Sequence, residues 1–139
     1  MKSLRTLLKL ARRDVETLRR ALADQIQRQQ TLEQRILGHD ATVRAEQQAA
    51  LKDYESARAY GGYAVAAVSA RRALDSECDV VAFEIDRLRT LISAALAEAR
   101  KFERLIELEE ARAKAAQEKH ENAELDEFAT LRAARPSSR

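Results

Sequence analysis

Apolar side chains recur every three or four residues along two long stretches of the chain, and this spacing excludes most folds. From residue 4 to residue 36, eight of ten positions on this spacing are apolar. An average repeat of 3.5 residues places these side chains along one seam of a helix, as in a coiled coil. The seam positions of this first stretch are Leu4, Leu8, Ala11, Val15, Leu18, Leu22, Gln25, Gln29, Leu32 and Ile36.

A second stretch follows the same rhythm from residue 74 to residue 116, with twelve of thirteen positions apolar. Upstream of it, the spacing runs through Tyr60, Tyr63, Ala67 and Ala70 to Leu74, where two successive four-residue steps predict a local phase slip. The second seam consists of Leu74, Cys78, Val81, Ile85, Leu88, Ile92, Ala95, Ala99, Phe102, Ile106, Glu109, Ala113 and Ala116.

The chain offers few places to turn between these helices. It has 3 glycines and 1 proline in 139 residues, together with 27 alanines, where average usage would give roughly 10 glycines and 7 prolines. We therefore expect few, long helices and no compact globular enzyme. The predicted fold is all-α, a single domain in which two long helices form an antiparallel coiled-coil hairpin.

The helix limits follow from capping and breaking residues. We predict helix one over about 3–52, a reversal within 52–62, helix two over about 57–134 and a tail at 135–139. Ser56 is the predicted N-cap of a helix that begins at Ala57. Gly61-Gly62 is the strongest local breaker, but the seam continues across it, which favours the early part of the range. Pro136 is expected to end helix two.

Charge supports the antiparallel arrangement. Residues 1–35 hold nine basic and four acidic side chains, whereas residues 103–127 hold nine acidic and four basic ones. A hairpin brings these segments together, and flanking charges set orientation in coiled coils. The net charge of +2 is too balanced for a dedicated nucleic-acid binder. A nucleic-acid role for the basic N-terminus is the weaker alternative, and we expect no nucleic-acid partner.

The sequence carries no arrangement typical of catalysis. No lysine with a following Ser or Thr comes after the paired glycines, as a phosphate-binding loop requires. Cys78 is interpreted as a seam residue, and His39 and His120 as solvated or interface residues. We predict a non-enzymatic protein with no metal, no cofactor and no small-molecule substrate. No apolar run approaches the roughly 18 residues of a membrane span, so we expect a cytoplasmic protein.

Two exposed features suggest partner binding. Tyr60 and Tyr63 lie beside the glycines, where they either face a partner or pack the hairpin tip. Phe128 and Leu131 lie late in helix two, beyond the reach of helix one, and predict a docking stripe.

The C-terminal segment also resembles a known family. Leu-Asp-Glu-Phe-Ala at 125–129, followed by Arg-Ala-Ala-Arg at 132–135, is similar to the ending of the flagellar export protein family FliJ. The opening, with Leu4, Thr6-Leu7, Ala11 and Asp14-Val15, is similar as well. The length and the two-helix pattern agree with the family over the whole chain.

The resemblance implies a stalk of the flagellar type III protein export apparatus, with roles in motility and chemotaxis. Its helix ends would enter the hexameric export ATPase, the region near its tip would contact the integral-membrane export gate, and it would handle export chaperones, peripherally at the inner membrane. The implied gate-contact residues are Tyr60, Tyr63, Ala67, Ala70 and Leu74. The implied ATPase-contact residues are Leu4, Leu7, Leu125, Asp126, Glu127, Phe128, Leu131, Arg132 and Arg135.

The chain departs from the family in helix one, where relatives can carry Leu and Tyr on the gate-facing side. This sequence has Arg35, His39, Thr42 and Glu46 there instead. Two alternatives remain open at this point: the equivalent stalk of an injectisome, and a generic coiled-coil scaffold or chaperone, including a parallel dimer of continuous helices.

Overall fold

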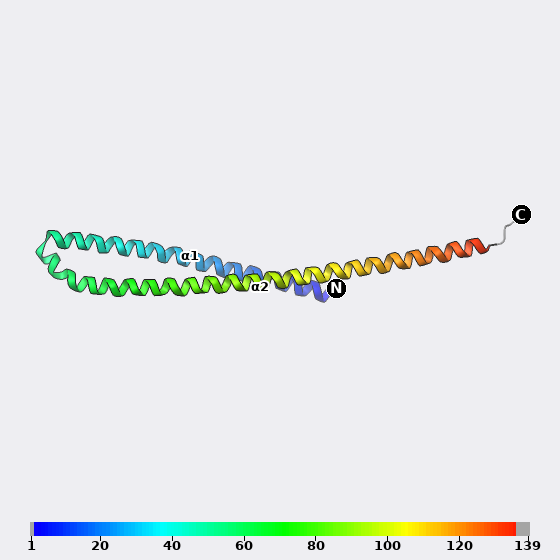
Figure 1. Cartoon of the computed structure of the whole chain (residues 1–139), viewed down its shortest axis with the longest axis horizontal. Helices are drawn as coiled ribbons and strands as arrows, with labels where there is room; N and C mark the ends of the chain where they lie inside the picture. The colour runs from blue at the N-terminus through cyan, green and yellow to red at the C-terminus, as the bar shows by residue number, and fades with distance from the viewer. Residues whose placement is uncertain (1, 136–139) are drawn as a thin grey trace. The chain divides into compact units, whose positions relative to one another are not determined.

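Two long helices make up the protein. A computed structural model describes residues 2–135, and within this range every residue except Asp53 and Arg135 is helical. Helix α1 comprises Lys2–Lys52 and helix α2 comprises Tyr54–Ala134. The predicted all-α fold is confirmed: the helices pack against each other as an antiparallel hairpin (Figure 1). A dimer of continuous parallel helices is therefore not the fold of this chain. Pro136 lies outside the described residues.

The chain divides into two compact units, which we describe separately. The hairpin unit comprises Asp14–Ala95 and contains the reversal between the helices. The end unit contains the start of α1, up to Arg13, and the part of α2 that begins at Leu96.

The reversal occurs at a single residue, Asp53, which closes one helix and opens the next. Its N–H donates to the Ala49 carbonyl at 3.2 Å, and its own carbonyl accepts from the Ala57 N–H at 3.0 Å. Its carboxylate accepts from the Glu55 N–H at 3.3 Å and from the Ser56 hydroxyl at 3.2 Å. Asp53 is therefore the N-cap of α2. The prediction of Ser56 as the cap is wrong, and α2 begins three residues before the predicted Ala57.

Gly61 and Gly62 lie inside α2 and do not form the turn. No residue of the described chain has a positive φ angle, so the reversal needs no glycine. A Cβ atom added at either position would meet no heavy atom within 4 Å. The paired glycines therefore lie within a continuous helix, and Asp53 marks the reversal.

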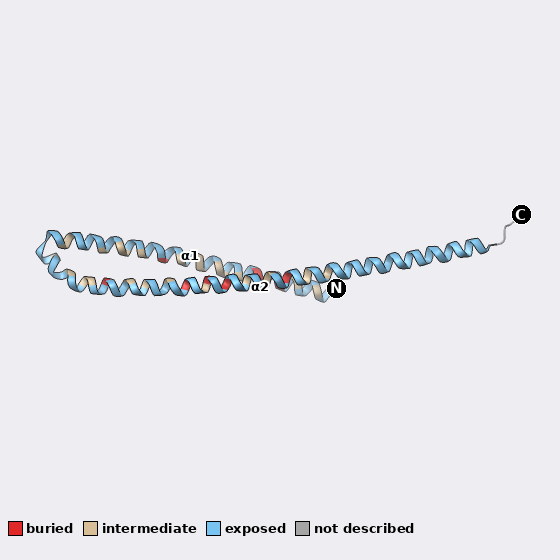
Figure 2. Cartoon of the chain, in the orientation of Figure 1, coloured by how far each residue is buried: buried red, intermediate tan, exposed pale blue. Residues whose placement is uncertain are grey.

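The core of the hairpin unit lies between the two helices, along the predicted seam. Leu32 of α1 packs with Val81 and Ile85 of α2, and these side chains are 2%, 1% and 4% exposed. Partly buried hydrophobic side chains surround this cluster: Leu22, Ile26, Leu74 and Cys78. Figure 2 shows the buried residues along the sides of the helices that face each other. All ten predicted seam positions of α1 are buried or half-buried.

Two predictions for the α2 seam are wrong. Ala70 is exposed, and the half-buried Arg71 takes the position that faces α1. The spacing 67–71–74–78 then alternates four and three residues, so the successive four-residue steps predicted at 70–74–78 are absent, and on the predicted seam they fall at 63–67–71 instead. The second error concerns the end of the seam. Glu109, Ala113 and Ala116 are exposed, because α1 begins at Lys2 and Arg5 already lies opposite Glu110.

The end unit pairs the basic start of α1 with the acidic part of α2, as the charge pattern predicts. Arg5 contacts Glu110 at 3.3 Å and Arg12 contacts Glu103 at 3.1 Å. Ala11 and Ala99 are buried in this unit. Every residue from Glu107 to Arg135 is exposed (Figure 2). Exposed ion pairs contribute little stability individually, so their main effect is on which segments pair.

Candidate functional site

The strongest polar link in the hairpin unit joins Asp40 of α1 to Arg71 of α2. The Arg71 Nη1 atom lies 2.5 and 2.6 Å from the two Asp40 carboxylate oxygens, and Arg71 Nε donates to Asp75 at 3.1 Å. The hydrogen bond from Arg71 lowers the pKa of the Asp40 carboxyl. The hydrogen bond to Asp40, followed by that to Asp75, raises the pKa of the guanidinium. This pair links the two helices at a position where the seam is polar.

His39 forms a second link beside this pair. Its Nε2–H donates to the carbonyl oxygen of Ala67 at 3.0 Å, which requires the proton to be on Nε2. His39 is half-buried, so of the two predicted roles the interface role is the one observed. Ala67 is 8% exposed and faces α1. This predicted gate-contact residue therefore has little surface left for a partner.

The other predicted gate-contact residues lie at different depths. Tyr60 and Tyr63 are half-buried, with ring centroids 6.2 Å apart and ring planes tilted by 39°. Leu74 packs against the core cluster. Ala70 is exposed. The tyrosine pair and Leu74 therefore combine packing with partial exposure, and Ala70 is the most accessible of the five.

Four apolar side chains near the reversal are far more exposed than the predicted ones and were not identified from the sequence. Leu51 is 88% exposed, Tyr54 81%, Val65 74% and Val68 53%. They lie outside the seam spacing, and a count of apolar residues off the seam would have found them. The periodic pattern identifies residues that face the other helix, so it cannot identify apolar residues on the outward-facing surface.

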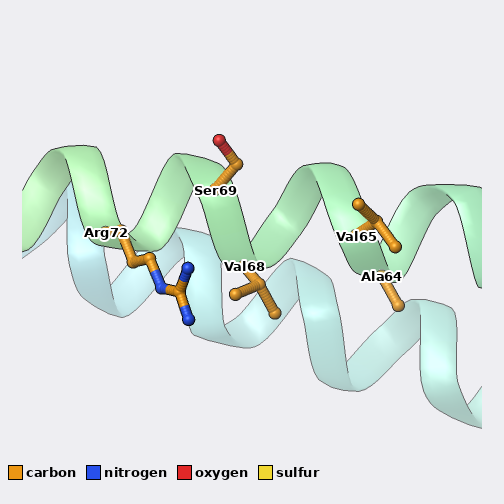
Figure 3. A pocket seen from close by; sticks show the side chains of 5 residues that line it. All are labelled: Ala64, Val65, Val68, Ser69 and Arg72. Atoms are coloured by element: carbon orange, nitrogen blue, oxygen red, sulfur yellow. The ribbon is translucent and has the colours of Figure 1, made fainter.

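Two of these side chains line a shallow groove on α2. We call it the valine groove and define it by Ala64, Val65, Val68, Ser69 and Arg72. Its volume is about 420 Å³. In Figure 3 the side chains of Ala64, Val68 and Arg72 point to one side of α2, and Ser69 points to the other. The groove thus has an apolar floor beside one cationic side chain.

The predicted ATPase-contact residues all lie in the end unit. Leu125, Phe128 and Leu131 are 65%, 64% and 63% exposed. Their polar neighbours Asp126, Glu127, Arg132 and Arg135 are exposed too, as is Leu7, whereas Leu4 is half-buried. The structure does not bring the two groups together. Arg5 pairs with Glu110, and residue 125 follows 15 residues later, about 22 Å along an ideal helix.

Residues 2–135 provide no candidate for catalytic or metal chemistry in either unit. This range contains no group of three or more His, Cys, Asp or Glu side chains arranged to hold a metal ion. Cys78 is a half-buried free thiol in the core cluster. Neither α1 nor α2, over the same range, has a segment apolar and long enough to span a membrane. What this part of the chain offers is a set of exposed helical surfaces.

Comparison with known proteins decides the family. The family model described as "Flagellar FliJ protein" matches residues 1–138. The chain belongs to the FliJ family. No curated protein and no solved structure matches it. The predicted resemblance is confirmed over nearly the whole chain, not only at the C-terminal motif.

Membership places this FliJ-family protein in the flagellar export apparatus as a non-catalytic component. His39 lies at a position where we expect family members to carry Leu or Tyr, and its side chain is bonded to the Ala67 carbonyl. His39 therefore contributes to the interface between the helices.

Proposed function

We propose that this FliJ-family protein is a stalk that couples the hexameric export ATPase to the integral-membrane export gate. The ATPase would be bound by the end unit through Leu4, Leu7 and the segment 125–135. The gate would be bound by the hairpin unit through Tyr60, Tyr63, Ala70 and Leu74, with Ala67 acting only through its packing on α1. Binding of export chaperones and a peripheral position at the inner membrane belong to the same proposal.

One observation supports the ATPase contact most strongly. From Glu107 to Arg135 the helix is exposed on all sides, yet it presents three large apolar side chains within seven residues. Leu125, Phe128 and Leu131 follow one another at three-residue intervals and share one side of α2. A contiguous exposed apolar stripe of this kind marks a protein interaction site. The flanking Arg132 and Arg135 add charge that can orient a partner.

The ATPase contact can be tested by enzyme stimulation. Wild-type protein should stimulate its cognate export ATPase, and truncation after Glu118 should abolish the effect. The double substitution Phe128→Glu with Leu131→Glu should weaken stimulation on the order of tenfold or more, as loss of buried anchors does at other interfaces. Equal stimulation by the truncated protein would show that the segment 125–135 has no such role.

A matched control is available on the same helix. Val80 and Phe83 are also exposed and three residues apart, at 66% and 73%, but they lie in the hairpin unit. Val80→Glu with Phe83→Glu introduces the same charges and should leave stimulation unchanged. If both double variants lose stimulation equally, the effect is one of charge or folding, not of the C-terminal segment.

The gate contact needs a separate measurement. Tyr60→Ala with Ala70→Glu should weaken binding to the purified export-gate protein in detergent. Tyr54→Ala removes a tyrosine that is 81% exposed near the reversal but outside the proposed contact, and it should bind like wild type. Undiminished binding of the Tyr60 and Ala70 variant would exclude these residues as the gate contact.

A further inference from the structure

The valine groove is an apolar accessible surface near the reversal, and the hairpin unit leaves it uncovered. Val65 is 74% exposed and Val68 is 53% exposed. Their side chains project beside the small Ala64, so an approaching chain can reach the surface of α2. Val65 makes no seam contact and has no evident role in holding the hairpin together.

The groove continues toward α1. A second hollow of about 230 Å³ shares Ala64 and Val68 with the valine groove and is also lined by Val43 of α1 and Tyr60 of α2. We call the two hollows, which share Ala64 and Val68, the trough; α1 lines only the second of them. A trough between two helices suits a third helix, which can lay an apolar face into it.

Charge around the trough points to one kind of partner. From residue 56 to residue 74 the chain carries three arginines and no aspartate or glutamate. Arg71 is engaged by Asp40 and Asp75. Arg58 and Arg72 make no ion pair within 4.0 Å among residues 2–135. A binding partner is therefore the natural source of carboxylates for these two arginines.

Arg58, Val65 and Arg72 are spaced by seven residues and so share one face of α2. The two arginines bracket the apolar floor at about 21 Å from each other along the helix. This arrangement disfavours a second copy of the chain. An antiparallel copy centred on Val65 would place each Arg58 against the other Arg72, and like charges repel.

The composition also disfavours a membrane surface. Helices that lie in the membrane interface bury bulky apolar residues such as Trp, Phe and Leu, whereas the valine groove offers only two valines and an alanine. A complementary helix can pack closely against small side chains such as these, and the many van der Waals contacts together stabilise the complex.

We propose that the valine groove binds an amphipathic helix of a partner protein, with an apolar stripe that is flanked by carboxylates about 21 Å apart. The apolar stripe covers Val65 and Val68, and the carboxylates pair with Arg58 and Arg72. The valine groove itself contains none of the residues proposed for ATPase or gate contact, whereas the second hollow is lined by Tyr60 and Ala67, which the proposed function names. The substitutions tested below are at Val65 and Arg72, outside the proposed contacts, so their outcome is separate from that of the proposed function.

Two synthetic helices of about 18 residues test the proposal with the full-length protein. Both carry the same Leu/Ala stripe, and the flanking residues are glutamates in one and lysines in the other. Fluorescence anisotropy should show the glutamate peptide binding at least about tenfold tighter than the lysine peptide. Val65→Glu should weaken glutamate-peptide binding by about tenfold or more. Arg72→Glu should abolish the preference between the two peptides, because Arg58 still attracts glutamates while the new carboxylate attracts lysines.

Phe83→Glu is the matched control, since Phe83 is 73% exposed on the same helix and outside the groove. It should bind both peptides as the wild type does, and circular dichroism should show equal helicity for all variants. The proposal is overturned if the glutamate peptide does not bind, if the two peptides bind equally, or if neither substitution changes binding. It is also overturned if phosphatidylglycerol vesicles bind in place of the peptides and lose binding in the Val65→Glu and Arg72→Glu variants.

Discussion

Asp40 and Arg71 lie 31 residues apart in sequence and form the shortest polar contact between the helices, with Nη1 2.5 and 2.6 Å from the two carboxylate oxygens. The pair occupies a position where apolar spacing alone would have placed Ala70 toward α1. The contact near the reversal is therefore made by a charged side chain, and the lowered pKa of Asp40 leads to a prediction about pH.

Removing this pair should change how the protein responds to acid. The hydrogen bond from Arg71 holds the pKa of folded Asp40 below its ordinary value of 3.8. A lowered folded-state pKa means that the pair stabilises the protein above this value and stops doing so as the pH falls through the folded pKa. Asp40→Asn should therefore melt at a lower temperature than wild type near neutral pH, and the difference should shrink toward about pH 2.

Thermal melts by circular dichroism across this pH range provide the measurement. Asp79→Asn is the control, because Asp79 is exposed and makes no ion pair within 4.0 Å among residues 2–135. Its melting temperature near neutral pH should lie closer to that of wild type than the melting temperature of Asp40→Asn does. A constant difference for Asp40→Asn would mean that Asp40 titrates alike in the folded and unfolded chain.

Leu32 should be the most costly single truncation in α1. Its side chain is 2% exposed and packs on Val81 and Ile85. Leu32→Ala removes these contacts and leaves a cavity, so we expect the free energy of unfolding to fall by about 2–5 kcal/mol. Urea unfolding monitored by circular dichroism measures the change. Leu37→Ala, at a position 63% exposed on the same helix, should cost under about 0.5 kcal/mol, and similar losses for both would contradict the observed seam.

Because Asp53 caps α2, replacing Asp53 should destabilise the protein more than replacing Ser56. Asp53 accepts the Glu55 N–H through its side chain, so Asp53→Ala should lower the free energy of unfolding by about 1 kcal/mol. Ser56 donates to Asp53 and caps no helix, so Ser56→Ala should change it by less than about 0.5 kcal/mol. The same urea unfolding assay applies. The reverse order would place the start of α2 near residue 57.

Replacing the paired glycines should stabilise the helix. Gly61 and Gly62 are helical, and an added Cβ meets nothing within 4 Å. Gly61→Ala and Gly62→Ala should therefore each raise the free energy of unfolding by about 0.5–1 kcal/mol, mainly by reducing the freedom of the unfolded chain. Gly38→Ala is the corresponding change in α1. A destabilised Gly61→Ala or Gly62→Ala variant would show that the backbone there departs from a regular helix.

Much of the fold was predictable because it depends on an apolar repeat of about 3.5 residues that continues over long stretches of the chain. The ten seam positions of α1 are buried or half-buried as the spacing predicts. That Arg71 and not Ala70 faces α1 was not predictable from the spacing of apolar residues. A period count treats a charged residue as an outward one, whereas Arg71 reaches Asp40 across the interface.

The candidate sites divide in the same way. The exposure of Leu125, Phe128 and Leu131 follows from helix length, since α1 cannot reach that far. The burial of Ala67 and the exposure of Val65 and Val68 depend on how α2 is rotated against α1. Successive residues of a helix point about 100° apart around its axis. An error of one residue in assigning the seam therefore exchanges a buried side chain for an exposed one.

The sequence by itself determined that this chain forms two long helices, that they run antiparallel, and that its family is that of a flagellar export component. The two helices and their antiparallel order follow from the scarcity of turn residues, the 3.5-residue period and the order of charges, whereas the family follows from the Leu-Asp-Glu-Phe-Ala segment at 125–129 and the matching opening. Only the tertiary structure decided where α2 begins, which side chains hold the register and which apolar surfaces stay accessible. Those outcomes depend on contacts between residues far apart in the chain, such as Asp40 with Arg71 and Leu32 with Val81, and no local pattern specifies which residues will meet.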